Sequence, residues 1–244
     1  MPLVSILIPA YNEGPSIAAL LAKVRAAPLE SLGFQKEVIV VDDGSQDATA
    51  NIARAFLGTK VLVQTLNQGK GAALRRAIQA STGDLILIQD ADLEYDPQDY
   101  PALLQALRPG VDAVYGSRTL GQIRAHHAFS FTPGRHPQQA FGAWLAAVLL
   151  SLWTFLLYGK WLTDTWTAYK LFPAALLTAM NITTSGFETD HEITAKLLKR
   201  GCHIVEVPIS YSPRNIAAGK KIKAGDGFVA VWTLFKFRFF SNRF

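Results

Sequence analysis

Continuous apolar runs alternate with helix-like apolar spacing through the first half of the chain. The runs predict buried β-strands at 4–8, 37–41, 61–64, 85–88 and 111–115. Apolar residues at helical spacing predict helices at 16–26, 48–57, 71–80 and 99–107. Strands without polar alternation, separated by helices, are typical of an α/β domain with a mostly parallel, doubly wound sheet. Helices are therefore expected on both faces, and a further strand is predicted at 206–211.

Polar residues follow three of these strands at the point where each strand ends. The three segments are Pro9-Ala10-Tyr11-Asn12-Glu13, Asp42-Asp43-Gly44-Ser45 and Gln89-Asp90-Ala91-Asp92. In open α/β sheets, ligands bind outside the carboxyl ends of the strands. The pattern therefore predicts one binding site at this edge of the sheet.

An uncharged stretch at 138–159 is long enough to raise the question of a membrane-spanning helix. It carries two stripes at helical spacing, a large apolar one and one of small residues, which favours a buried or interfacial helix. The large stripe is Phe141, Leu145, Val148, Leu152 and Phe155, and the small one is Ala143, Ala147, Ser151 and Thr154. A span would also separate the two halves of the chain that are expected to form one site.

The end of the chain, 228–244, interleaves aromatic and basic side chains. This composition suits either a helix packed on the core or a segment lying on anionic lipid. We accordingly divide the chain into a domain at 1–225, which includes the apolar helix, and a basic aromatic tail at 226–244.

Composition narrows the class of protein. Of the 244 residues, 50% are hydrophobic and 18% are charged, which excludes a disordered chain. The net charge of +5 is concentrated near the C-terminus, which indicates phosphate-bearing partners. Cys202 is the only cysteine, so neither an intramolecular disulfide nor a cysteine zinc site is expected, and a reducing compartment fits. The apolar run at 3–9 has no basic residue ahead of it, so no signal peptide is expected.

Asp90 and Asp92 are candidates for a divalent metal site. In an extended backbone, residues two apart point to the same side, so these carboxylates can share one ion and Glu94 can continue the same edge. Mg²⁺ and Mn²⁺ prefer oxygen ligands and can neutralise a diphosphate. An Asp-X-Asp sequence is common, and its place after a buried strand is what makes this one informative.

Other residues at the same edge suit a nucleotide. Tyr11 can lie against a base, Glu13 can accept a hydrogen bond from ribose or base, and Asp43 can accept hydrogen bonds from a base. A helix cap is the competing interpretation of Asp43. Lys70, in Asn67-Gln68-Gly69-Lys70-Gly71 at the start of a predicted helix, can meet a phosphate, although this segment lacks the spacing of a P-loop.

A second basic region follows the strand predicted at 206–211. Arg214 and the Gly219-Lys220-Lys221 segment can fold over a diphosphate and exclude water, although a solvated run of charges is the simpler interpretation. His126, His127 and His136 show no regular metal-ligand spacing and are expected at the surface.

Together these segments resemble family 2 glycosyltransferases, and more narrowly the dolichol-phosphate mannosyltransferase and polyprenyl-phosphate glycosyltransferase group. The resemblance covers nearly the whole chain. It rests on the segments above and on Gly116-Ser117-Arg118, Leu162-Thr163-Asp164-Thr165, Tyr169-Lys170, Phe187-Glu188, Glu206-Val207-Pro208-Ile209-Ser210-Tyr211 and Gly219-Lys220-Lys221-Ile222. It implies a single GT-A domain, which is Rossmann-like, with inverting chemistry and a metal-bound nucleotide sugar.

The resemblance also implies roles for individual residues. The nucleoside would be contacted by Pro9, Tyr11, Glu13 and Asp43. The metal would be held by Asp90 and Asp92, with Glu94 as a third ligand. Donor or acceptor phosphates would be contacted by Arg118, Arg214 and Lys220. An ionised acceptor phosphate needs no strong base, whereas a hydroxyl acceptor needs a carboxylate, for which Asp190 and Glu192 are the candidates.

The leading hypothesis is therefore transfer of a hexose, from GDP-mannose or a UDP-sugar, to a polyprenyl or dolichyl phosphate. The transfer would use Mg²⁺ or Mn²⁺ at the cytoplasmic face of a membrane, with peripheral contact. A transferase acting on a soluble or polysaccharide hydroxyl and a non-catalytic nucleotide-binding protein are the alternatives. Nucleic acid is not an expected partner, because no recognisable reading module is present. The sequence does not indicate an oligomeric state.

Overall fold

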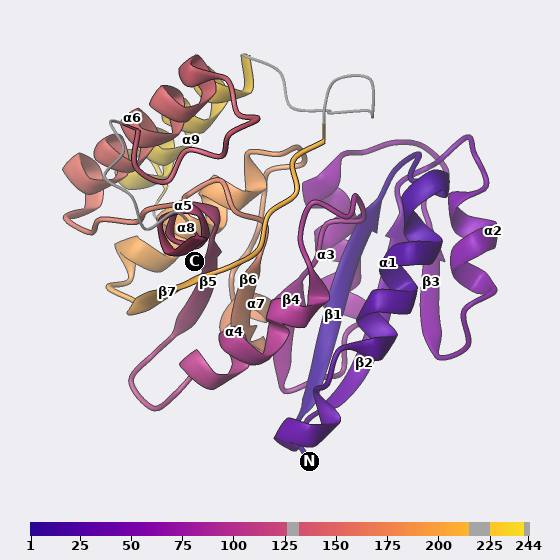
Figure 1. The fold of residues 1–244 in the computed structure, drawn as a ribbon. Coiled ribbons are helices and arrows are strands. Elements are labelled where there is room, and N and C mark those ends of the chain that lie inside the picture. The colour runs from indigo at the N-terminus through magenta and orange to yellow at the C-terminus, as the bar shows by residue number, and fades with distance from the viewer. Residues whose placement is uncertain (126–131, 215–224, 242–244) are drawn as a thin grey trace.

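A seven-stranded sheet forms the centre of the computed structural model, which describes residues 1–125, 132–214 and 225–241 (Figure 1). The strand order is β3-β2-β1-β4-β6-β5-β7. All neighbouring pairs are parallel except the two that involve β6. The strands are β1 (Leu3–Ala10), β2 (Gln35–Asp42), β3 (Thr59–Val63), β4 (Leu85–Ile88), β5 (Ala113–Ser117), β6 (Lys170–Pro173) and β7 (Ile204–Pro208).

Helices cover both faces of the sheet because neighbouring strand residues point to opposite sides. Ile6 and Ile8 of β1 belong to one hydrophobic cluster, while Leu7 between them belongs to the other. The first cluster includes residues of α1 (Gly14–Ala26), α2 (Thr49–Arg54) and α4 (Tyr100–Ala106). The second includes residues of α3 (Lys70–Ala80), α7 (Ala174–Thr178) and α8 (Thr189–Lys199). Short 3₁₀ turns, η1 (Glu30–Leu32) and η2 (Pro97–Asp99), lie in the connections.

The predicted α/β class and the mostly parallel sheet are confirmed. All five strands predicted in the first half are present, and β4 has the predicted bounds. The strand predicted at 111–115 begins two residues later, and the one predicted at 206–211 is β7. The four predicted helices are also present, within a few residues at each end.

The sequence patterns did not predict β6. It has only four residues, begins with a lysine and ends with a proline, so it carries no apolar run. It lies between β4 and β5 and is antiparallel to both, with Lys170 paired to Ile88 and to Tyr115. Because β6 runs the other way, its first residue lies at the edge where β4 and β5 end. Lys170 is thereby brought to the predicted site.

Two helices lie outside the sheet layers. α6 (Phe141–Tyr158) and α9 (Gly225–Phe239) contact α8 and each other through a third hydrophobic cluster. The large apolar stripe predicted on α6 is exposed. The small stripe packs only in part, since Ser151 and Thr154 are buried, whereas Ala147 is half-buried and Ala143 is exposed. Most of the segment predicted as a tail forms α9, in which Leu234 and Phe237 are buried and Trp232 is exposed. α5 (Arg118–Ala125) directly follows β5.

Candidate active site

The ends of β1, β2 and β4 lie side by side, as predicted from the polar segments that follow them. Ala10 is paired with Asp42, and the N–H of Asp43 donates to the carbonyl of Ala10 at 2.8 Å. On the other side of β1, the N–H of Gln89 donates to the carbonyl of Leu7 at 3.0 Å. One edge of the sheet therefore carries the Tyr11, Asp43 and Asp90 loops together.

The prediction of an extended backbone from Asp90 to Glu94 is wrong. β4 ends at Ile88, and Leu93 has a φ of 62°, in the left-handed region that reverses the chain. The carboxylate of Asp92 accepts the N–H of Glu94 at 3.1 Å, which stabilises this turn. Glu94 therefore does not continue the row of Asp90 and Asp92. Its carboxylate accepts the Tyr211 hydroxyl at 3.0 Å and the Arg214 N–H at 2.7 Å.

Lys70 lies between two carboxylates. Its Nζ is 2.9 Å from Oδ1 of Asp90 and 2.9 Å from Oδ2 of Asp190, in the first turn of α8. The other oxygen of Asp190 is 3.2 Å from Nζ of Lys170. Lys70, Lys170 and Asp190 are all buried or nearly so, and such buried pairs persist only when each charge has a partner. The phosphate contact predicted for Lys70 stays a prediction, since its ammonium already has two partners here.

Arg214 connects the C-terminal part of the chain to the same edge. Its guanidinium donates to both oxygens of Glu13, at 3.0 and 2.8 Å, and lies 3.2 Å from Oδ2 of Asp92. Burial alone would lower the pKa of Arg214, but its hydrogen bonds to Glu13 and the charge of Asp92 raise that pKa above its ordinary value. Glu13 is buried and committed to this ion pair, so the nucleoside contact predicted for it stays a prediction.

These contacts form two sets of charged groups, one around Lys70 and one around Arg214. Asp90 of the first set and Asp92 of the second interact electrostatically, and we call the eight groups together the charged cluster. Its members are Glu13, Lys70, Asp90, Asp92, Glu94, Lys170, Asp190 and Arg214. Five carboxylates face three cations, which leaves a formal excess of two negative charges. Burial raises the pKa of Asp90 and of Asp92, so keeping both ionised is costly without a further positive charge.

The cluster suits a divalent ion that also binds a substrate. Among the described residues, no three acidic, histidine or cysteine side chains form a ready-made metal cage. Mg²⁺ is usually bound by one or two carboxylates together with substrate phosphates and water, and Asp90 and Asp92 offer that donor set. The excess of two negative charges matches one dication. Glu94, as a third ligand, stays a prediction.

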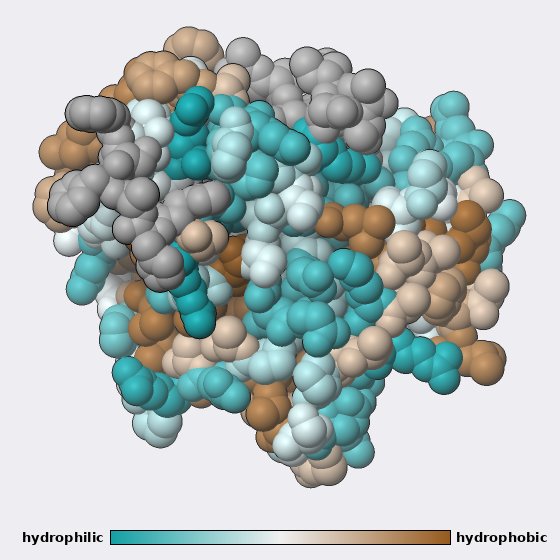
Figure 2. Space-filling view, viewed as in Figure 1, coloured by the Kyte–Doolittle hydropathy of each residue, from teal (hydrophilic) through white to brown (hydrophobic). Residues whose placement is uncertain are grey.

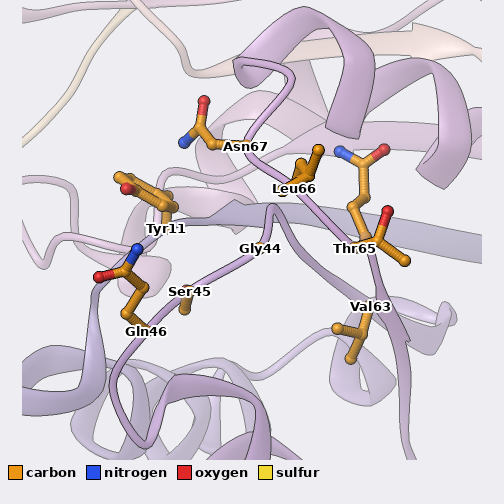
Figure 3. Close-up of a pocket in the computed structure, with 9 residues that line it drawn as sticks. Tyr11, Gly44, Ser45, Gln46, Val63, Thr65, Leu66 and Asn67 are labelled. Atoms are coloured by element: carbon orange, nitrogen blue, oxygen red, sulfur yellow. The ribbon is translucent and has the colours of Figure 1, made fainter.

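A cleft of about 700 Å³ lies among the segments that follow β1, β2 and β3 (Figure 3). It is lined by Tyr11, Gly44, Ser45, Gln46, Val63, Gln64, Thr65, Leu66 and Asn67. In this view Tyr11 and Gln46 lie on one side of Gly44, and Thr65 lies on the other. Gly44 has a φ of 73°, and a Cβ there would lie 2.6 Å from the backbone of Leu66, so the wall of the cleft requires glycine.

Asp43 does not line this cleft but holds one of the loops that do. It is buried, and its carboxylate accepts hydrogen bonds from Gln64 Nε2 at 2.6 Å, Gln68 N–H at 2.8 Å and Gly69 N–H at 2.8 Å. Burial raises its pKa despite these donors. Asp43 thus holds the loop from β3 to α3, and its predicted contact with a base stays untested. Pro9, the other predicted nucleoside contact, lies half-buried within β1.

Arg118 is held by a second set of polar contacts. Its Nε and one NH2 nitrogen each lie 2.7 Å from an oxygen of Asp164, and its guanidinium lies 5.1 Å from the centre of the Tyr211 ring. Glu206 fixes the Asp164 segment by accepting N–H groups of Thr163 and Asp164. Arg118 thus lies beside Tyr211, whose hydroxyl contacts Glu94, and its phosphate contact stays a prediction.

The two carboxylates considered as general bases both have lysine partners, and that role stays a prediction. The lysines around Asp190 lower its pKa to about 2 despite burial, so it is ionised but weakly basic. Glu192 accepts N–H and hydroxyl groups of Thr183 and Thr184 and pairs with Lys196 at 2.6 Å. It holds the loop before α8.

Two predicted residues, Lys220 and Lys221, lie outside the described residues, as do His126 and His127. Two residues of the site were not predicted from their own sequence pattern. Lys170 and Asp164 appeared only within segments that resemble the family, and no pattern of their own marked them. A lysine beside apolar residues at the start of a short strand was the one available signal for Lys170.

Comparison with known proteins agrees with this architecture. The solved structure of glucosyl-3-phosphoglycerate synthase from Mycobacterium tuberculosis in complex with UDP superposes over 97% of this chain and 80% of its own, with a TM-score of 0.70 and 19% identity. Mannosyl-3-phosphoglycerate synthase from Rubrobacter xylanophilus also has a TM-score of 0.70, at 19% identity over 97% of this chain and 72% of that one. The fold is that of the GT-A glycosyltransferases.

The family follows from sequence. The model described as glycosyl transferase family 2 matches residues 5–138, and the chain belongs to this family. It is a glycosyltransferase.

Two curated relatives with named activities are similar to parts of this chain. An undecaprenyl-phosphate 4-deoxy-4-formamido-L-arabinose transferase of Aeromonas hydrophila is 40% identical over 46% of this chain and 36% of its own length. The low-salt glycan biosynthesis hexosyltransferase Agl6 of Haloferax volcanii is 30% identical over 88% of this chain and 49% of its own length. The chain thus spans about a third to a half of the relatives it matches.

Proposed function

We propose that this glycosyltransferase moves a hexose from a nucleotide diphosphate sugar to a polyprenyl phosphate, with inversion and with Mg²⁺ or Mn²⁺. The observation that carries the proposal is the charged cluster, whose described members have an excess of two negative charges. It lies at the sheet edge whose loops also line a cleft of about 700 Å³. A metal–diphosphate complex is the ligand that would match both features. The name of the relative from Aeromonas hydrophila supports a polyprenyl phosphate acceptor, and that of the relative from Haloferax volcanii supports transfer of a hexose.

The donor would lie across the edge of the sheet. Tyr11 and the walls of the cleft would hold the base, and Asp90 and Asp92 would hold the ion. A bound divalent ion supplies Lewis-acid neutralisation of the leaving diphosphate. Arg214 and Lys70 already lie against the same two carboxylates and would orient the phosphates with their positive charge.

The acceptor would approach from the side of Arg118 and Tyr211. A phosphate monoester is already ionised at neutral pH, so its oxygen can attack the anomeric carbon as the nucleotide diphosphate leaves, without a base. Asp190 has a pKa near 2, which suits this reaction better than one that needs a proton removed from a hydroxyl. Catalysis would then consist of positioning and charge neutralisation.

An exposed apolar surface supports a lipid acceptor. Apolar side chains gather over α6 and α9 (Figure 2). Only 17% of the residues of α6 are buried. Leu156 on α6 is 66% exposed, and Phe228 on α9 is 82% exposed. Lys236 and Arg238 on α9 are exposed beside this apolar surface and can meet anionic headgroups. We infer peripheral contact at the cytoplasmic face of a membrane, with aromatic side chains in the interface.

A product assay tests the proposal. Protein is mixed with vesicles containing polyprenyl phosphate, with a panel of UDP- and GDP-sugars, and with Mn²⁺, Mg²⁺ or a chelator. We expect a lipid-linked sugar only with metal, and a loss of at least about a hundredfold in Asp92→Asn, because one of the two proposed ligands of the ion that neutralises the diphosphate is weakened. Glu30→Gln, on the exposed far side of the domain, is the control that should retain turnover. Transfer only to soluble hydroxyl acceptors would overturn the lipid part of the proposal.

A further inference from the structure

Lys70 contacts two carboxylates that belong to different parts of the site. Asp90 follows the end of β4 and is a proposed metal ligand, whereas Asp190 lies at the start of α8. The Lys70 ammonium is 2.9 Å from each. Its side chain is 9% exposed, and that of Asp90 is 24% exposed. Lys70 is therefore the resident cation at one of the two carboxylates on which a divalent ion would depend.

The backbone of Lys70 has little freedom to move. The N–H of the next residue, Gly71, donates to the carbonyl of Ser185 at 2.7 Å. A Cβ on Gly71 would meet the carbonyl oxygen of Thr184 at 2.5 Å, so the start of α3 is packed directly against this loop. Any change in the partners of Lys70 must therefore come from its side chain alone.

Asp190 gives that side chain a second anchor. Its other oxygen is 3.2 Å from Lys170, whose side chain is fully buried and also donates to the carbonyl of Thr167. Asp190 is thus fixed from behind, while Asp90 lies at the more open edge. A dication arriving at Asp90 would repel the ammonium, and Asp190 remains as its counter-ion.

We propose that Lys70 is a positioning residue that competes with the divalent ion for Asp90, and that Asp190 retains the displaced ammonium. The inference rests on the proposed metal-dependent function. Before the ion binds, Lys70 neutralises Asp90. The competition lowers the affinity for the ion alone, so that tight binding requires the added negative charge of the diphosphate.

The test is Mn²⁺ binding to the full chain, measured without any sugar nucleotide by the loss of the free-ion signal in electron paramagnetic resonance. Lys70→Gln removes the competing cation and should tighten Mn²⁺ binding on the order of tenfold. Asp190→Asn removes the second carboxylate partner of Lys70, so that its ammonium stays at Asp90, and should weaken Mn²⁺ binding. Lys60→Gln is the matched control, because that exposed lysine donates to the carbonyl of Ala80 away from the cluster. Circular dichroism and melting curves establish that each variant is folded.

Opposite signs in the two variants would support the inference, since loss of folding weakens binding in both. If wild type binds Mn²⁺ and Lys70→Gln binds it equally or more weakly, the inference is overturned and the proposed function stands. If neither wild type nor Lys70→Gln binds Mn²⁺, with or without a nucleoside diphosphate, the metal-dependent function fails together with the inference.

Discussion

Replacing Asp190 with Asn tests how much the charged cluster contributes to stability. Asp190 accepts two charge-assisted contacts, from Lys70 at 2.9 Å and from Lys170 at 3.2 Å, and its side chain is 7% exposed. Asn has nearly the same shape as a protonated Asp, so the substitution removes the charge with little change in volume. The protein should still fold, because the surrounding apolar clusters are untouched.

The pKa of Asp190 sets the magnitude. A fall from the ordinary 3.8 to about 2 corresponds to about 2.4 kcal/mol of stabilisation at neutral pH. A carboxylate whose pKa is depressed in the folded state stabilises fully above its unfolded pKa, near 4. It loses that contribution as the pH falls towards the folded pKa, near 2. About 1 kcal/mol should already be lost by pH 3.

Urea denaturation at a series of pH values measures this effect. At pH 7, Asp190→Asn should lower the free energy of unfolding by about 2–3 kcal/mol, and the gap from wild type should narrow by about 1 kcal/mol by pH 3. Glu30→Gln breaks a 3.3 Å pair in which Glu30 is 59% exposed, and should cost at most about 0.5 kcal/mol. A gap below about 1 kcal/mol at pH 7, or one that does not depend on pH, would refute the reasoning.

Three further predictions concern the cleft, the lipid surface and the loop before α8. Gly44→Ala should weaken binding of UDP or GDP at least about tenfold in calorimetry, because a Cβ would meet Leu66 and the φ is positive. Leu152→Glu on α6 should lower binding to anionic vesicles in flotation assays at least about tenfold. Leu57→Glu is the control, because Leu57 is also exposed but lies on the loop after α2. Equal binding by the two variants would contradict membrane contact through the apolar surface of α6 and α9. Glu192→Gln should reduce the free energy of unfolding by about 2–4 kcal/mol in urea, since the buried Lys196 loses its charged partner and keeps the carbonyl of Asn181; an unchanged midpoint would contradict this.

The order of strands and helices in the first half could be predicted because each element carries its own periodic pattern. β4 illustrates this, since four apolar residues between polar segments have one reasonable interpretation. The position of the site was predictable for a related reason. Parallel strands end at one edge, so the segments after β1, β2 and β4 had to meet there, as Tyr11, Asp43 and Asp90 do.

Conformation within the loops was less predictable. The extended spacing expected for Asp90, Asp92 and Glu94 fails because Leu93 adopts a left-handed conformation that no neighbouring residue type indicates. The sequence patterns also did not indicate that the carboxylate of Asp43 accepts N–H groups of the loop after β3, and its predicted contact with a base stays a prediction.

The sequence by itself determined the α/β class, the edge that carries the site and the two-faced character of α6, because each depends on local spacing. Only the tertiary structure decided which charges meet. Arg214 reaches Glu13 from 201 residues away, and the antiparallel β6 places Lys170 behind Asp190. Ion pairs of this kind form where folding excludes water and leaves a charge without another partner, and no periodicity along the chain records that.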